Sequence, residues 1–268
     1  MMKGIALGFG LGLTLMLMLM ASGRAATLAT LDTSLGRIEL EFYDEDKPVT
    51  VSNFIAYVQS GKYEDIFIQR WVTNFVFQAG GFFVGTNASG APIIHSVQPF
   101  GQITNEYNVG RTFSNEYGTI AMARQARATN SASSQWFINV ANNAFLDEVD
   151  GGFTVFGRVL TGTNILNLFV PPAGTSGLWQ VNVDGGALAT VPVTTNQNVD
   201  YDDLIYVNVL LRRELGLKIL PGRTGRTLTW NSVSGMSNVV EYASGFPPQW
   251  QILTNLPGTG GPISIAEP

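Results

Sequence analysis

Residues 63–81 (YEDIFIQRWVTNFVFQAGG) contain the side chains of this chain that are best suited to chemistry. A strand-like run ends in Arg70 and is followed by Asn74-Phe75, Gln78 and Gly80-Gly81. A guanidinium stays charged and carries a rigid fork of N–H donors, so it suits fixed hydrogen-bond donation rather than proton transfer. Taken alone, Arg70 reads as a surface charge and Gln78 as a solvated or capping residue. Only their joint arrangement favours a functional site.

The composition excludes several other kinds of site. The 268 residues include no cysteine, so disulfides, thiolate zinc sites and cysteine nucleophiles are excluded. The single histidine, His95, could formally support a Ser-His-Asp triad, but its Pro/Gly-flanked setting favours a surface or loop residue. Without clustered carboxylates, no metal or organic cofactor is implied. The net charge of −5, with no run of Lys or Arg, argues against a nucleic-acid partner.

The apolar pattern predicts a mainly β fold. Hydrophobic residues make up 45% of the chain, which is ample for a core. We expect a hairpin from Thr27 to Phe42 with its turn at Leu35-Gly36, and a helix that Pro48 opens and Gly61 ends. The other expected elements are strands at Phe67–Trp71, Phe75–Gln78, Thr119–Ala123, Trp136–Val140, Thr154–Leu160 and Tyr201–Leu211, and a short helix at Asn164–Phe169. Many strands and two convincing helices indicate a closed antiparallel barrel capped by helices, with long loops at 83–117 and 171–200.

The two ends of the chain differ from this middle part. Lys3, an apolar run from Ile5 to Met20 and small residues up to Ala26 follow the order of a secretory signal. We expect cleavage after Ala25 or Ala26, with an uncleaved anchor as the alternative. Residues 221–268 predict short strands separated by Ser/Gly/Pro turns, as in a partial β-sandwich module. The predicted organisation is therefore a signal peptide (1–25), a barrel domain (26–220) and a short C-terminal β extension (221–268).

Three blocks of sequence, in order, resemble the cyclophilin-type peptidyl-prolyl cis/trans isomerases. The first is residues 63–81, and the second is residues 118–140 (GTIAMARQARATNSASSQWFINV). The third combines Phe145-Leu146-Asp147 with FTVFGRV at residues 153–159. With the opening hairpin TLDTSLGRIELEFYD and its helix, the resemblance covers about residues 27–211. It implies the cyclophilin β-barrel and isomerisation of X–Pro bonds.

The resemblance also implies roles for particular residues. Arg70 would donate a hydrogen bond to the prolyl nitrogen of the twisted substrate, and Gln78 would hold the guanidinium and the substrate backbone. Gln135 would bind the substrate main chain, and Ala123 would contact it beside the proline pocket. The implied pocket consists of Phe75, Val76, Met122, Phe137, Leu146 and Phe153. Taken alone, the apolar residues of this set would more often be core, and Gln135 would be solvated or capping.

Some positions depart from the family pattern. Gln69 stands where the family usually has histidine, Thr73 where it has proline, and Phe82 where an acidic residue or glycine follows the glycine pair. Phe153 stands where histidine or tyrosine is frequent, which makes the pocket more apolar. The stretch between Ala123 and Gln135 is slightly longer than usual.

We therefore expect a monomeric periplasmic or secreted isomerase that acts on proline-containing polypeptides and assists the folding of exported proteins. After cleavage of the signal it would not contact a membrane. Two alternatives remain at this point. One is a non-catalytic module of a cell-surface protein that binds proline-containing peptides. The other is a cell-surface structural protein that uses the barrel as a scaffold.

Overall fold

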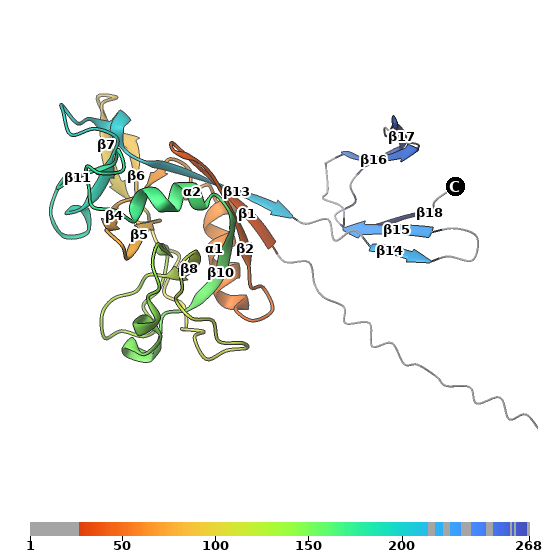
Figure 1. Ribbon diagram of the computed structural model, residues 1–268, viewed down its shortest axis with the longest axis horizontal. Helices are drawn as coiled ribbons and strands as arrows, with labels where there is room; N and C mark the ends of the chain where they lie inside the picture. The colour runs from red at the N-terminus through yellow and green to blue at the C-terminus, as the bar shows by residue number, and fades with distance from the viewer. Residues whose placement is uncertain are drawn as a thin grey trace, which may run out of the picture.

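The computed structural model describes residues 27–213, 218–221, 226–231, 237–244, 249–257, 259 and 261–266. Strands dominate the chain, and a single large sheet forms its main body (Figure 1). Among the described residues, no helix combines the length and apolar character needed to span a bilayer. The expected signal segment, residues 1–25, lies outside the described residues.

The main sheet has 11 strands in the order β4-β5-β9-β8-β10-β2-β1-β13-β3-β6-β7, and all of its ladders are antiparallel. Its members are β1 (Thr27–Thr33), β2 (Gly36–Phe42), β3 (Ile66–Phe67), β4 (Arg70–Val72), β5 (Val76–Ala79), β6 (Phe82–Thr86), β7 (Pro92–Ser96), β8 (Thr119–Met122), β9 (Trp136–Asn139), β10 (Val155–Thr161) and β13 (Tyr206–Arg213).

The chain itself connects the two sides of this sheet, which gives a barrel-like fold. Strand β4 is at one end of the strand order, whereas β3, which pairs with β13, lies near the other end. Only Ile68 and Gln69 separate β3 from β4. The Ile68 N–H donates to the Ile205 carbonyl, and the Gln69 N–H donates to the Gln78 carbonyl. These two residues therefore link β3 to β4 across the open side of the sheet, and the predicted cyclophilin-like β fold is confirmed.

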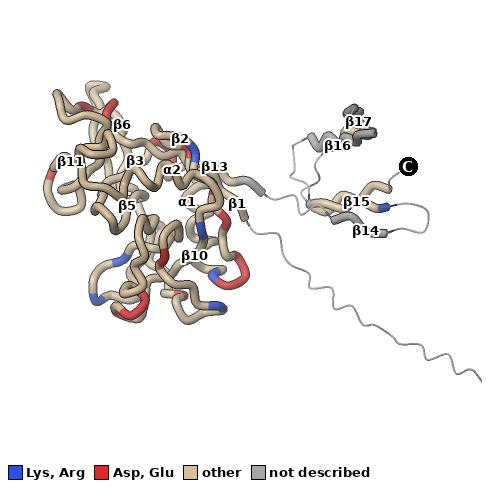
Figure 2. Tube along the Cα trace, in the orientation of Figure 1, with Lys and Arg blue, Asp and Glu red and all other residues tan. Residues whose placement is uncertain are grey.

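Alternate residues of each strand point into the barrel, and these inward-pointing residues are mostly apolar. Trp71, Phe77, Ile120, Ile138 and Phe156 all belong to one buried cluster, and none is more than 1% exposed. Most charged residues of the barrel lie instead in loops, where positive and negative side chains are interspersed (Figure 2).

Helix α1 (Pro48–Gln59) covers the barrel with its buried face, which includes Val51, Phe54 and Tyr57. The carboxylate of Glu106 accepts hydrogen bonds from the free N–H groups of its first turn, at 3.1 Å from Val49 and 2.7 Å from Thr50. The second helical segment, α2 (Thr163–Leu166), continues into a 3₁₀ turn at Asn167–Phe169. Both predicted helices are confirmed.

Most predicted strands are also confirmed, with shifted boundaries. The first hairpin pairs Thr33 with Gly36, so its turn lies at Ser34-Leu35, one residue earlier than predicted. The predicted strand Phe67–Trp71 is divided, because Ile68 and Gln69 form the junction of the barrel. The predicted strand at Tyr201–Leu211 begins only at Tyr206, because Tyr201–Asp203 forms a 3₁₀ turn capped by Asp200.

The two long loop regions contain further strands. The first includes part of β6 and all of β7, and the second includes the hairpin of β11 (Trp179–Val181) and β12 (Val191–Val193). The remaining strands are β14 (Lys218–Pro221), β15 (Arg226–Asn231), β16 (Ser237–Ser244), β17 (Gln249–Pro257) and β18 (Pro262–Ala266). They form two small sheets apart from the barrel sheet (Figure 1). The boundary at residue 220 and the partial β-sandwich stay predictions.

Candidate active site

A row of directly paired residues crosses five strands on the outer face of the barrel. Arg70 pairs with Gln78, Gln78 with Phe137, Phe137 with Ala121, and Ala121 with Val155. Paired residues in an antiparallel sheet point to the same face. The sheet therefore places a guanidinium and an amide at one end of a row that becomes apolar.

The Arg70 side chain is half-buried, and this burial lowers the pKa of its guanidinium below its ordinary value. Within the described part of the chain, the guanidinium has no hydrogen-bond or ion-pair partner. A half-buried, unengaged fork of donors is well suited to a hydrogen-bond acceptor that arrives with a substrate.

Three glutamines form one hydrogen-bonded cluster beside Arg70. The Oε1 of Gln135 accepts from the Nε2 of Gln69 at 2.9 Å and from the Nε2 of Gln78 at 2.6 Å. The Oε1 of Gln69 accepts from the Gly81 N–H at 3.1 Å. Gln78, which we expected to hold the guanidinium of Arg70, is thus directed to Gln135. Among the described residues, the Nε2 of Gln135 has no hydrogen-bond partner, so its N–H groups can serve a further acceptor.

Gly81 leaves the space that this cluster requires. A Cβ at Gly81 would lie 2.7 Å from the Nε2 of Gln69 and 2.9 Å from the Cδ of Gln135, closer than van der Waals contact permits. Packing against Gln69 and Gln135 therefore explains why the second residue of the predicted glycine pair is a glycine.

An apolar cluster continues from the glutamines along the row. Its buried members are Val76, Ala121, Phe137, Leu146 and Val155, and the partly buried side chains packed on it are Tyr43, Phe75, Phe113, Ala123 and Phe153. The rings of Phe137 and Phe153 meet edge to face, with their centroids 5.9 Å apart. This cluster unites six of the predicted substrate-binding residues: Phe75, Val76, Ala123, Phe137, Leu146 and Phe153.

Met122 does not join this cluster. It pairs with Trp136 and packs inside the barrel, where it is 1% exposed. The physical reason is strand alternation: Ala121 points to the groove, so its neighbour Met122 points to the core. The structure therefore corrects the placement of Met122 in the proline pocket.

Phe145 was not among the predicted binding residues. Its side chain is 57% exposed, and its ring stacks on Phe75 with the centroids 5.7 Å apart. An exposed aromatic ring against the edge of an apolar groove extends the surface available to a ligand.

Buried asparagines fix the loops that carry Phe75 and Leu146. The Nδ2 of Asn143 donates to the Phe75 carbonyl at 2.8 Å and to the Oδ1 of Asn139 at 2.7 Å. Asn115 is fully buried and donates to the Oδ1 of Asp147, the residue after Leu146, at 2.8 Å. Sequence reasoning missed this network because isolated asparagines read as loop residues.

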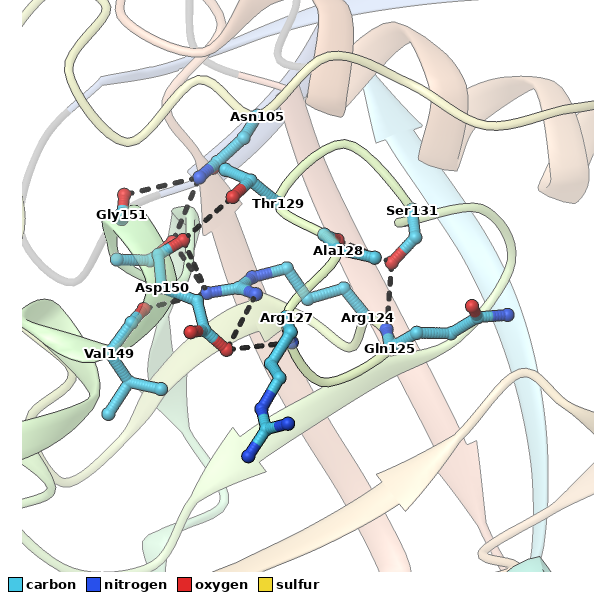
Figure 3. A network of polar contacts seen from close by, with 11 residues as sticks. Asn105, Arg124, Gln125, Arg127, Ala128, Thr129, Ser131, Val149, Asp150 and Gly151 are labelled. Atoms are coloured by element: carbon cyan, nitrogen blue, oxygen red, sulfur yellow. Dashed lines mark hydrogen bonds and ion pairs between the residues drawn. The ribbon is translucent and has the colours of Figure 1, made fainter.

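A buried arginine, Arg124, contacts Phe153 of the apolar cluster and is held by Val149 and Asp150, as the polar contacts in Figure 3 show. The Arg124 side chain is 2% exposed, and its guanidinium lies 4.1 Å from the centroid of the Phe153 ring. Its Nη2 donates to the carbonyls of Val149 at 2.7 Å and Asp150 at 3.1 Å. Its Nη1 lies 3.7 Å from the Asp150 carboxylate, and burial lowers the pKa of the guanidinium. Arg124 thereby connects the loop before Phe153 to the segment that follows strand β8.

A polar cleft of about 170 Å³ adjoins the glutamines. It is lined by Gln78, Ala123, Arg124, Gln125, Ser131, Ser133 and Gln135.

His95 contributes nothing to this region: it lies on β7 and stacks on Phe83 with ring centroids 5.3 Å apart. Among the described residues, no group of three or more His, Cys, Asp and Glu side chains is arranged to hold a metal ion.

Comparisons with known proteins agree with this geometry. The sequence model of the cyclophilin type peptidyl-prolyl cis-trans isomerases matches residues 28–171. A peptidyl-prolyl cis-trans isomerase of Acinetobacter baylyi is 36% identical over 165 residues, which cover 60% of this chain and 81% of the relative. Peptidyl-prolyl cis-trans isomerase B of Escherichia coli is 35% identical over 159 residues, covering 57% of this chain and 90% of the relative.

A solved cyclophilin-type isomerase of Cryptosporidium parvum was also found, with a TM-score of 0.48 and 17% identity, covering 70% of this chain and 99% of that one. The family assignment depends on the sequence matches, which extend from β1 to the segment after α2 and include every residue of the row described above. This chain belongs to the cyclophilin-type peptidyl-prolyl cis-trans isomerase family.

Proposed function

We propose that this chain isomerises X–Pro bonds at the groove of the row Arg70–Gln78–Phe137, with Arg70 as the catalytic donor. The observation that carries the proposal is the guanidinium of Arg70, which no described residue engages, at the polar end of an apolar cluster. The groove thus offers a donor to the amide and an apolar surface to the ring of the same proline residue.

The reaction requires little chemical machinery. An X–Pro bond isomerises over a barrier of roughly 20 kcal/mol because amide resonance is lost when the bond twists. The prolyl nitrogen becomes pyramidal and basic in the twisted state, so a donor directed at it stabilises that state over both planar ones. Every ~1.4 kcal/mol removed from the barrier increases the rate tenfold.

Each part of the groove has a place in this mechanism. The apolar cluster around Phe137 and Phe153 takes the proline ring, and Arg70 donates to the prolyl nitrogen. Gln135 binds the substrate main chain through the amide N–H groups that its neighbours leave unengaged. No proton is transferred, and no cofactor enters a step.

The proposed setting is the folding of exported proteins, in the periplasm or outside the cell. The support is the N-terminal sequence, in which Lys3 precedes an apolar run and small residues up to Ala26. Slow isomerisation of proline bonds limits the folding of many proteins, so an isomerase in that compartment would act on newly exported chains. Cell fractionation and N-terminal sequencing of the expressed chain test this setting: a cytoplasmic chain that keeps residues 1–25 would contradict it.

The activity is tested with an Ala-Pro peptide, comparing the full chain with its Arg70→Ala variant. We expect the variant to lose about 10²–10³-fold in kcat/KM, the loss typical when one donor to a transition state is removed. Arg37→Ala is the matched control, because Arg37 is an exposed arginine at the β1–β2 turn that pairs with Asp32. A wild-type chain that binds the peptide without accelerating its isomerisation would contradict the catalytic proposal and favour a binding module.

A further inference from the structure

Strand β4, which carries Arg70, lies at the end of the strand order and pairs with β5 along one side only. The backbone groups of Trp71 on its other side are nevertheless engaged. The Trp71 N–H donates to the Thr190 carbonyl at 2.8 Å, and the Trp71 carbonyl accepts from the Nε2 of Gln180 at 2.9 Å. Residues 172–200 thus cover the edge of the strand that carries the catalytic arginine.

This segment lies beyond the part of the chain that matches the family, which ends at residue 171. It is nevertheless firmly packed. Its strands β11 and β12 pair with each other, with Gln180 opposite Pro192. Val191 and Val193 are fully buried in a cluster with Phe67 of β3. The segment therefore contacts the chain on both sides of Arg70, at Phe67 and at Trp71.

The position of Arg70 depends on the backbone of β4. Within the described part of the chain its guanidinium has no hydrogen-bond or ion-pair partner, so no polar contact of its own fixes its direction. The adjacent Trp71 is fully buried, and its Nε1–H donates to the Phe169 carbonyl at 2.7 Å. The contacts that hold the backbone of β4 consequently set the position from which the Arg70 side chain extends into the groove.

We propose that residues 172–200 are a positioning element for Arg70, with Gln180 as the positioning residue that holds Trp71. This inference rests on the proposed catalytic role of Arg70. Loosening β4 would misdirect the donor that acts only on the twisted substrate, so it lowers kcat and leaves KM nearly unchanged.

The decisive variant is Gln180→Glu in the full chain. A carboxylate has the shape of the amide but cannot donate, so it places an acceptor against the Trp71 carbonyl. At pH 7 we expect kcat for an Ala-Pro peptide to fall about five- to tenfold, with KM within about twofold of the wild type. Protonation restores a donor, so the loss should diminish as the pH is lowered to about 4, near the ordinary pKa of glutamate.

Three comparisons complete the experiment. Gln197→Glu adds the same charge to an exposed position of the same segment and should behave as the wild type at every pH. Gln180→Met removes the donor without adding charge, and we expect a smaller loss of kcat with no recovery at low pH. Hydrogen exchange at the Trp71 amide reports on β4 independently of activity and should accelerate in both Gln180 variants.

The outcomes separate the two proposals. An inactive wild-type chain contradicts the proposed function itself. An active wild type with Gln180→Glu equal to Gln197→Glu at pH 7 overturns the positioning role and leaves the function intact. A loss of kcat that does not recover at low pH, or that occurs without faster exchange at Trp71, overturns it as well.

Discussion

The side-chain amide of Gln69 lies 2.9 Å from the Oε1 of Gln135 and donates a hydrogen bond to it from a position with no exposed surface. Gln69 stands where the family usually has histidine, so it supports the groove from inside without an ionisable group. Its own oxygen is engaged by the Gly81 N–H. The orientation of Gln135 thus depends on a residue that a substrate cannot reach.

Gln69→Leu tests this dependence. The substitution removes the donor to Gln135 and leaves the buried Gly81 N–H without an acceptor, which should lower the free energy of unfolding by about 1–3 kcal/mol. We expect kcat/KM to fall about three- to tenfold, because Gln135 loses one of its two fixed donors. Urea unfolding and the Ala-Pro assay measure the two effects, with the exposed Gln98→Leu as control. Unchanged values of both would contradict the role of Gln69.

Loss of the Arg124 side chain should lower the free energy of unfolding far more than loss of its ion pair with Asp150. Arg124→Met removes the donors to the carbonyls of Val149 and Asp150 and the cation beside Phe153, and should destabilise the chain by about 2–3 kcal/mol. It should also raise KM, because Phe153 loses its support. Asp150→Asn removes the charge of the 3.7 Å pair, and the amide oxygen can still accept from the Arg127 N–H, which donates to the Asp150 carboxylate at 2.8 Å. It should therefore change the free energy of unfolding by less than about 1 kcal/mol. Equal losses of stability in the two variants would mean that Arg124 stabilises the chain mainly through its ion pair with Asp150, and would contradict this prediction.

Phe145→Ala should weaken binding without weakening the fold. Its ring is 57% exposed and contacts Phe75 at the edge of the groove, so we expect a KM increase of about three- to tenfold with an unchanged unfolding midpoint. Phe100→Ala is a close control, since Phe100 is 56% exposed and packs instead on Tyr57 of α1. A KM that does not move, or that moves equally in both variants, would argue against Phe145 as part of the binding surface.

Tyr63 should make the chain sensitive to alkali. Burial raises the pKa of its phenol well above 10, while the hydroxyl donates to the Ser134 carbonyl. Below pH 10 the phenol is protonated in both states and its contribution to stability is complete. Above pH 10 the unfolded chain loses this proton first, so stability falls by about 1.4 kcal/mol per pH unit for this group.

Tyr63→Phe removes that alkaline component. We expect the variant to be about 1 kcal/mol less stable at pH 8 and to lose less stability between pH 10 and 11 than the wild type. Urea unfolding at pH 8, 10 and 11 measures both quantities. Parallel curves for the two proteins would mean that another group dominates the alkaline loss.

Much of the barrel could be predicted because its strands follow simple alternation. Ile38, Leu40 and Phe42 were expected on one face of a strand, and all three are buried. The same rule could have placed Met122 correctly, since Ala121 and Met122 are neighbours on β8 and must face opposite sides. Met122 was assigned to the proline pocket from its position in the motif, without regard to the face of the strand on which it lies.

Other contacts left no signal in the residue types. Arg124 and Gln180 bind backbone carbonyls, and any residue can supply a carbonyl. Their partners are Val149 and Trp71, which are 25 and 109 positions away along the chain. The loops that bring them together have no periodic pattern, so only the folded chain reveals these contacts.

The amide cluster has a consequence for where such an enzyme can work. The groove is composed of three side-chain amides, a guanidinium and hydrocarbon rings, and none of these groups changes its protonation state near neutrality. A histidine in place of Gln69 would add an ionisable group beside Arg70. The amide of Gln69 adds none, so we expect mild acidification to leave the charges of these groove side chains unchanged.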